Sequence, residues 1–239
     1  MRLLPAFLFT ALITQFSAAA ALGTAARTVI PADVQQIISV DYRQLSNSSV
    51  AGELHDRALP DNMKQFESAL KSVGISPDRD IDHLTFASFR DAGQIRSLNA
   101  NGQLTDIMPG VDSGAVWSVL DAEGTQAMMR SALGDAARLA DFETLKKRLL
   151  ASRYQMNFDQ GVKFDLDVIT SDSVTAATLS AVVKAGMLYK KMQVSGPEKA
   201  ALDSMSVESD SDQLRFHFRA DDKKFQTLLN SELFAAVSH

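Results

Sequence analysis

The segment RYQMNFDQGVKFDLD, residues 153–167, decides the fold, because its alternation fixes how it pairs with itself. A three-residue loop at Asp159–Gly161 places glycine where a left-handed backbone is needed. The pairs that follow put apolar side chains on one face: Phe158 with Val162, Met156 with Phe164, and Tyr154 with Leu166. On the other face Arg153 meets Asp167 as an opposite-charge pair. A two-residue loop would mix the faces, so we predict an antiparallel hairpin with one buried face.

A second hairpin follows around a loop at Ser211–Asp212. Its predicted pairs are Val207 with Phe216, Met205 with Phe218 and, on the opposite face, Glu208 with Arg215. The chain between the hairpins predicts two helices. The first begins at Ser171 or Asp172 with an apolar stripe, and a shorter one begins after Pro197. We predict a last helix that is capped near Asp221. The residues expected to face the core are Phe225, Leu228, Leu229 and Leu233.

The N-terminal half also alternates strand and helix patterns. We predict strands at residues 38–42, 84–89 and 115–120, the last of which contains the single Trp. Helices are predicted to begin at Ser48 or Ser49 and at Pro60–Asp61, with further helices at about 123–133 and 141–151. In the helix that begins at Pro60–Asp61, the apolar residues at helical spacing are Met63, Phe66, Leu70 and Val73. Residues 91–114 are broken by Asn-Gly and Pro-Gly steps and are the predicted linker.

These patterns predict an α+β protein. The order strand, capped helix, proline-led helix, strand occurs in 38–89 and again in 164–218, which favours two related modules of β-α-β, ferredoxin-like type. We expect antiparallel or mixed sheets with helices packed on one face. The predicted boundaries are a signal peptide at 1–20, a first and incomplete module at 27–90, the linker at 91–114 and a second module at 115–239.

The first twenty residues are typical of a secretory signal. Arg2 is followed by an apolar run and by an alanine-rich end that contains the A-x-A step of a cleavage site. We expect cleavage near residue 20 and a periplasmic or extracellular protein. The span from Leu3 to Leu22 is also long enough to cross a bilayer, which leaves an uncleaved single-pass anchor as the alternative.

Bulk composition excludes several classes of function. The chain contains no cysteine, so it forms neither disulfides nor a lipid-bearing N-terminal Cys. Its formal net charge of −5 disfavours nucleic-acid binding. We find no dinucleotide or phosphate-binding glycine motif and no pair of histidines at metal-ligand spacing, so we expect no cofactor and no metal.

Two short motifs invite a catalytic or metal-binding interpretation. Asp78, Asp80 and Asp82 have the spacing of a calcium loop but lack its glycine and its final glutamate, so a solvated acidic turn is favoured. Ser68 and Lys71 match S-x-x-K, the serine–lysine pair of penicillin-recognising enzymes, but the companion motifs are missing. We therefore assign no catalytic residue.

The strongest candidate contact face is a basic stripe in the second hairpin. Arg215, His217 and Arg219 alternate along one strand and therefore share its outer side. Such a face is able to contact an anion. The favoured interpretation is an ordinary polar sheet face whose charge is balanced by Glu208.

Four stretches carry a resemblance to a known group: residues 84–89, 116–121, 133–136 and 233–238. Together they resemble a family of uncharacterised exported bacterial proteins. The resemblance covers most of the chain beyond residue 20 and contains no motif of known chemistry. It implies export and no catalytic residue.

The sequence thus favours an exported, non-enzymatic protein of the cell envelope that binds a partner protein or small ligand or supports structure. One alternative is an exported hydrolase whose residues meet only in the fold and include His217 or Ser68. The other is the single-pass anchored protein, and only that form contacts a membrane.

Overall fold

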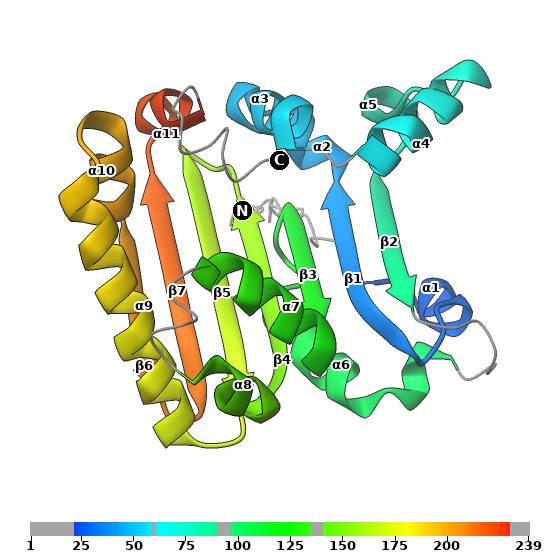
Figure 1. Cartoon of the computed structure of the whole chain (residues 1–239). Helices are drawn as coiled ribbons and strands as arrows, with labels where there is room; N and C mark the ends of the chain where they lie inside the picture. The colour runs from blue at the N-terminus through cyan, green and yellow to red at the C-terminus, as the bar shows by residue number, and fades with distance from the viewer. Residues whose placement is uncertain (1–21, 59–60, 90–96, 135–140, 230–239) are drawn as a thin grey trace, which may run out of the picture.

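One open antiparallel sheet of seven strands organises the chain, in the order β2-β1-β3-β4-β5-β7-β6 (Figure 1). The computed structural model describes residues 22–58, 61–89, 97–134 and 141–229. The strands are β1 (Val34–Asp41), β2 (His83–Phe89), β3 (Val116–Leu120), β4 (Leu149–Asn157), β5 (Val162–Thr170), β6 (Met205–Asp210) and β7 (Gln213–Ala220). The chain is therefore a mixed helix-and-sheet protein, as predicted.

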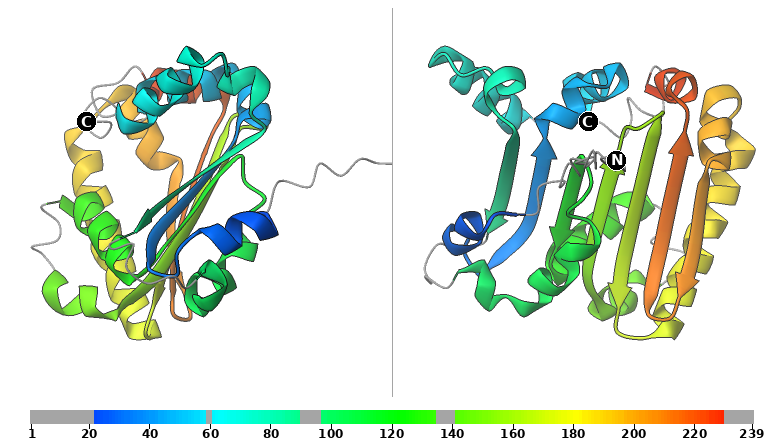
Figure 2. Two further views of the ribbon diagram at one scale, coloured as in Figure 1. Left: turned by 90° about the vertical axis from the view of Figure 1, so that its right-hand side faces the viewer. Right: turned by 180° about the vertical axis from the view of Figure 1, so that it is seen from behind.

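Helices lie on both faces and at one end of this sheet (Figure 2). They are α1 (Thr24–Val29), α2 (Tyr42–Ser46), α3 (Ser49–Ala58), α4 (Asp61–Ser72), α5 (Pro77–Asp80), α6 (Gly102–Ile107), α7 (Ala122–Leu133), α8 (Phe142–Leu145), α9 (Ser173–Gln193), α10 (Gly196–Asp203) and α11 (Asp222–Leu229). In Figure 1, α7, α8 and α9 stand in front of the sheet, and α2–α5 and α11 lie at its upper end. The side view in Figure 2 places α1 and α6 behind it.

The prediction that helices pack on one face only is wrong, because β1 and β3 are apolar on both sides. Ile37, Trp117 and Val119 point to the back of the sheet and are buried there. The segment around α6 covers them with its own buried apolar residues, Leu98, Leu104, Met108 and Val111. A two-sided apolar strand needs a cover on each face.

The front face carries two clusters of buried side chains. One joins β1 and the ends of β4, β5 and β7 to α3 and α11. The other lies beneath α7 and α9 and contains Leu149, Val168, Leu179, Val207 and Leu214. The front of the sheet is thus the main core, and α7 and α9 are its outer layer.

Both predicted hairpins are confirmed in register. In the first, Met156 pairs with Phe164 and Arg153 pairs with Asp167. In the second, the observed pairs are Met205 with Phe218, Val207 with Phe216 and Glu208 with Arg215. Gly161 has a φ of 114°, and a Cβ there would meet the Ala220 carbonyl oxygen at 2.2 Å, so this loop needs glycine.

Two separate ferredoxin-like modules are not confirmed. Strands from both predicted modules belong to the same sheet, in which β3 pairs with β1 on one side and with β4 on the other. Within the predicted linker, residues 98–110 form α6 between two 3-10 turns, η1 (Leu98–Ala100) and η2 (Met108–Gly110). The division into domains stays a prediction.

The predicted helix over 141–151 is wrong in its length. Helix α8 ends at Leu145, a 3-10 turn η4 follows over Lys146–Arg148, and Leu149 already begins β4. Phe142 and Leu149 are both buried, as their spacing suggested, but on two different elements. Cross-strand pairing with β5 competes successfully with the helical pattern.

Helix α4 is rotated relative to the prediction. Glu67 is buried to 6% exposure, whereas Phe66 is 43% exposed and Val73 is 72% exposed. Hydrogen-bond donors from α2 and α3 hold Glu67 and draw this side of the helix inward. The side chain of Met63, which completes the predicted apolar stripe, lies outside the described residues.

Several predictions fall outside the part of the chain that the structure describes. These are the signal peptide at 1–20, the start of the linker at 91–96 and the final residues from 230 onward, including Leu233. Among the described residues, no helix combines the length and apolar character required to cross a bilayer.

Candidate functional site

The predicted basic stripe lies on β7, on the back of the sheet, and acidic side chains accompany it. Asp165 on β5 is 2.6 Å from Nδ1 of His217 and 2.6 Å from Nη2 of Arg219. Asp210 forms an ion pair with Arg215 at 3.0 Å. Glu208, the predicted partner of Arg215, is its cross-strand neighbour. Among the described residues, however, Arg215 forms its ion pair with Asp210.

These contacts change the acidity of Asp165. Partial burial alone would raise its pKa, but hydrogen bonds and charge from His217 and Arg219 outweigh burial and hold the pKa below the usual range. Asp165 therefore keeps its negative charge beside two of the three stripe residues. A free anion that approached the stripe would also be repelled by this carboxylate.

The neighbouring strand pair extends the same pattern. Arg153 on β4 donates to Asp167 at 2.9 Å, and both side chains are mostly buried. Arg153 also donates to the Ile107 carbonyl at 3.2 Å, which joins α6 to the sheet. Gly110 leaves room for this guanidinium, because a Cβ at that position would lie 2.0 Å from it. The back face of β4, β5 and β7 is thus a matched charge network that holds the structure together.

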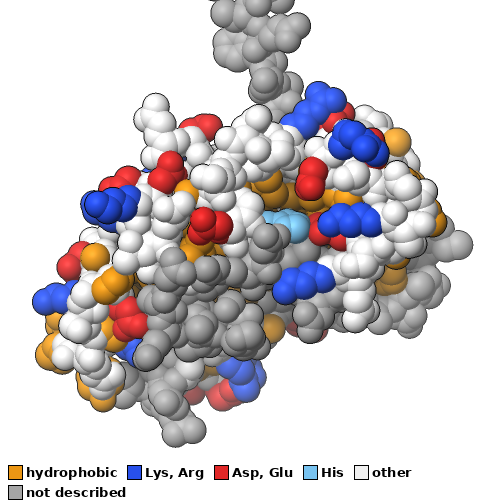
Figure 3. All heavy atoms as spheres, turned by 90° about the horizontal axis from the view of Figure 1, so that it is seen from above, with side chains coloured by type: hydrophobic (Ala, Val, Ile, Leu, Met, Phe, Trp, Pro, Cys, Tyr) orange, Lys and Arg blue, Asp and Glu red, His pale blue; other side chains and the backbone are white. Residues whose placement is uncertain are grey.

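A second polar cluster is buried where α2, α3 and α4 meet. Glu67 accepts a hydrogen bond from the Tyr42 hydroxyl and lies 2.8 Å from Nε2 of His55. Burial raises the pKa of Tyr42, and the adjacent Glu67 carboxylate raises it further. Figure 3 looks onto this end of the molecule and shows acidic and basic side chains interspersed over its surface. The cluster ties three helices together.

The short motifs do not assemble into a site. Ser68 donates to the Lys64 carbonyl on its own helix, and both Ser68 and Lys71 are exposed. Asp80 is held by Arg79, which together with the Ser76 amide lowers its pKa to about 2, while Asp82 pairs with Arg43. Within the described ranges, no group of three or more acidic or histidine side chains has metal-binding geometry.

A large concave feature with apolar walls lies on the other face, between α7, α9 and the sheet. We call it the α7–α9 cavity. Its volume is about 1040 Å³. The described lining residues are Met128, Met129, Ala132, Leu133, Phe164, Leu166, Val183, Gly186, Met187, Tyr189, Lys190, Gln193, Leu202, Met205 and Phe216. This volume is slightly above the range of about 300–1,000 Å³ that is typical of small-molecule sites.

The chemistry of these walls is simple. Four methionines supply flexible, polarisable side chains that adapt to the shape of a ligand. The polar groups come from the last turns of α9: Tyr189, Lys190 and Gln193. Lys190 is the only charged side chain among the described lining residues.

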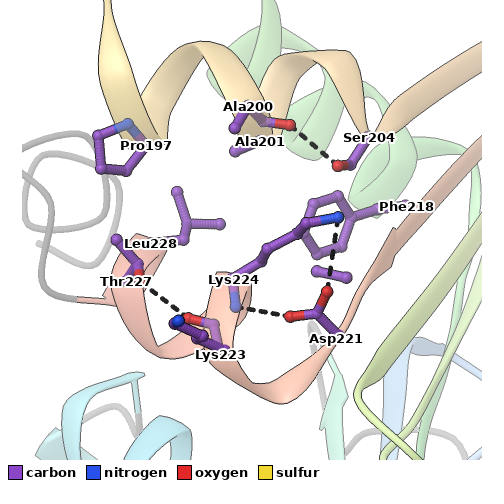
Figure 4. A pocket seen from close by; sticks show the side chains of 11 residues that line it. Pro197, Ala200, Ala201, Ser204, Phe218, Asp221, Lys223, Lys224, Thr227 and Leu228 are labelled. Atoms are coloured by element: carbon purple, nitrogen blue, oxygen red, sulfur yellow. Dashed lines mark hydrogen bonds and ion pairs between the residues drawn. The ribbon is translucent and has the colours of Figure 1, made fainter.

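A smaller cavity of about 330 Å³ lies between α10 and α11 (Figure 4). Pro197, Ala200 and Ala201 face it from α10, and Thr227 and Leu228 face it from α11. Two lysines and an aspartate also line it, with Asp221 accepting from the backbone amide of Lys224 at 2.8 Å as the cap of α11. This arrangement explains the start of α11 without a ligand.

Sequence analysis missed the α7–α9 cavity, because its walls come from segments far apart in the chain. One signal was present. Leu179, Val183 and Gly186 form one stripe of the predicted helix, and Lys190 follows Gly186 by four residues on the same stripe. A charged residue therefore lies where an apolar one is expected. The basic stripe was placed correctly on the outer face of its strand, but Asp165, 52 positions away from His217, lies beside it.

Comparison with protein-family models, with curated proteins and with solved structures finds no match. Function must therefore be inferred from the cavity and the polar clusters themselves.

Asp165 offers a test of the back-face network. Its pKa is lower in the folded protein than in an unfolded chain, so its charge stabilises the fold above the ordinary Asp pKa of about 4. That contribution is lost as the pH falls through the folded-state pKa. We expect Asp165→Asn to lower the free energy of unfolding by about 1 kcal/mol at neutral pH and to lessen the loss of stability in acid.

Urea unfolding at neutral and acidic pH measures both effects. Asp159→Asn is the matched control, because Asp159 lies exposed in the hairpin loop. Equal destabilisation by the two substitutions would contradict the role given to Asp165.

Proposed function

We propose that this chain is an exported, non-catalytic binding protein that holds an apolar molecule in the α7–α9 cavity. The observation that carries the proposal is the combination of size and chemistry: about 1040 Å³ lined mainly by methionine, leucine, valine and phenylalanine side chains. Sites for small molecules are mostly apolar and have a few polar groups that orient the ligand.

The placement of the cavity supports the same function. Its floor is formed by Phe164, Leu166 and Phe216 on two central strands, and the sheet holds these side chains in fixed positions. Its sides are formed by α7 and α9, with Leu202 of α10 beside them, and the methionines among these side chains are flexible. A rigid floor with adaptable methionine walls suits binding of a flexible apolar molecule.

The ionisable groups that a hydrolase would need are engaged elsewhere in the fold. His55, His83 and His217 each lie beside a carboxylate, at 2.8, 3.8 and 2.6 Å respectively. Ser68 is hydrogen-bonded within its own helix on the far side of the molecule from β7. The polar groups at the cavity are a phenol, an amide and an amine, which suit holding a ligand better than cleaving one.

Export remains part of the proposal and is supported by the sequence of residues 1–20 and by the resemblance to exported bacterial proteins. We propose the periplasm or the exterior as the location. An uncleaved N-terminal segment would instead hold the same binding domain at a membrane surface.

We also propose that the two halves share an ancestral ferredoxin-like plan. The supporting observation is that β1 and β5 are each followed by helices and then by a strand of the same sheet, β2 and β6 respectively. The halves differ in that β7 lies between β5 and β6, whereas β1 and β2 are direct neighbours.

Filling the cavity should weaken binding of a neutral apolar dye. Gly186→Phe adds a ring from α9 and Ala132→Phe adds one from α7, so each occupies ligand space from a different wall. We expect each substitution to weaken binding of N-phenyl-1-naphthylamine at least tenfold, measured by the rise in its fluorescence.

Ala185→Phe is the matched control. It adds the same ring to the neighbouring residue of α9, which is exposed and absent from the described lining. The proposal fails if purified wild-type protein does not bind the dye, or if Ala185→Phe weakens binding as much as Gly186→Phe does.

N-terminal sequencing of the protein recovered from producing cells tests export. We expect a product that begins shortly after residue 20 and appears outside the cytoplasm. An intact Met1 in the membrane fraction would favour the anchored form instead.

A further inference from the structure

We propose that the ligand of the α7–α9 cavity is a single-chain amphiphile with an anionic head, whose chain occupies the cavity and whose head pairs with the ammonium group of Lys190. This inference rests on the proposed function and adds the chemical class of the ligand. It follows from where Lys190 lies, from what surrounds it and from the absence of an ion-pair partner for it among the described residues.

Lys190 lies on the side of α9 that faces the cavity. It is placed 4, 7 and 11 residues after Gly186, Val183 and Leu179, so all four share one stripe of the helix. Leu179 is fully buried, and Val183, Gly186 and Lys190 all line the cavity. The stripe thus changes from apolar to cationic as the cavity reaches the surface.

The charge of Lys190 is uncompensated within the described structure. Its neighbour Lys191 pairs with Asp203 at 2.9 Å. Lys190 makes no side-chain hydrogen bond or ion pair with any described residue, and helix α9 contains no acidic residue. A lone cation at the edge of an apolar cavity is complementary to a ligand that is apolar at one end and anionic at the other.

Neighbouring groups complete a site for the head. Tyr189 and Gln193 line the cavity beside Lys190 and supply a hydroxyl and an amide as further donors. Tyr189 is 62% exposed, which places this polar rim at the surface. The C-terminal end of a helix carries roughly half a negative elementary charge, which disfavours an anion, but the full positive charge of Lys190 in that last turn outweighs it.

Competition with a neutral dye tests separately whether the cavity binds apolar molecules and whether it prefers an anionic head. The dye N-phenyl-1-naphthylamine is bound first, and decanoate, decyl phosphate or decanol is then titrated at neutral pH. These competitors share a chain and differ only in the head. We expect both anions to displace the dye from wild-type protein at about one tenth of the decanol concentration.

Lys190→Gln should remove this preference. It removes the charge but keeps a polar side chain, so we expect the dissociation constants of both anions to rise about tenfold and that of decanol to stay within twofold. Lys184→Gln is the matched control on the same helix, because Lys184 is exposed and is not among the lining residues. A preference for one anion over the other identifies the head as carboxylate or phosphate.

Equal displacement by anions and alcohol, or equal effects of Lys190→Gln and Lys184→Gln, would overturn the inference while leaving an apolar binding site in place. Failure of the dye to bind, or of every competitor to displace it, would overturn the proposed function as well.

Discussion

Alternation along the β4–β5 hairpin is the constraint on which the rest of the structure depends. Its register puts Met156, Phe164 and Leu166 on the front of the sheet and Arg153 and Asp167 on the back. A slip of one residue would move the apolar side chains of one strand to the face opposite those of its partner. Helices α7 and α9 pack on the apolar front. On the charged back, α6 is joined to the sheet by the hydrogen bond that Arg153 donates to the Ile107 carbonyl.

The cavity is a consequence of the same arrangement. Helix α7 follows β3 and packs on β4, whereas α9 follows β5 and packs on β5, β6 and β7. The two helices therefore lie over different parts of one face, and the apolar floor between them belongs to β5 and β7. Long methionines line this space, and an apolar space of this kind binds apolar ligands. The proposed function follows from this division of the front face.

Local features of this fold were predictable, and long-range ones were not. Both hairpins could be paired from sequence because their strands are joined by short loops and glycine marks the tighter turn at Gly161. The pairing of β1 with β3 joins residues about 80 apart and has no local signal, so the single sheet was missed. The rotation of α4 was missed because Phe66 and Glu67 are adjacent, and donors from Tyr42 and His55 decide which is buried.

The candidate sites show the same difference between local features, which the sequence predicts, and long-range ones, which it does not. The outer-face position of His217 followed from alternation alone, but its partner Asp165 required knowledge that β5 lies beside β7. The cavity required the positions of three helices and three strands together. Only Lys190, a charge continuing an apolar stripe, marked it in the sequence.

Methyl NMR of methionine-labelled protein tests the central claim most directly. Met128, Met129, Met187 and Met205 line the α7–α9 cavity, whereas Met108 is fully buried behind the sheet. Titration with decanoate should shift the four cavity methyl signals and leave the Met108 signal in place. Unchanged cavity signals, or shifts of the same size at Met108, would contradict the claim that this cavity is the binding site.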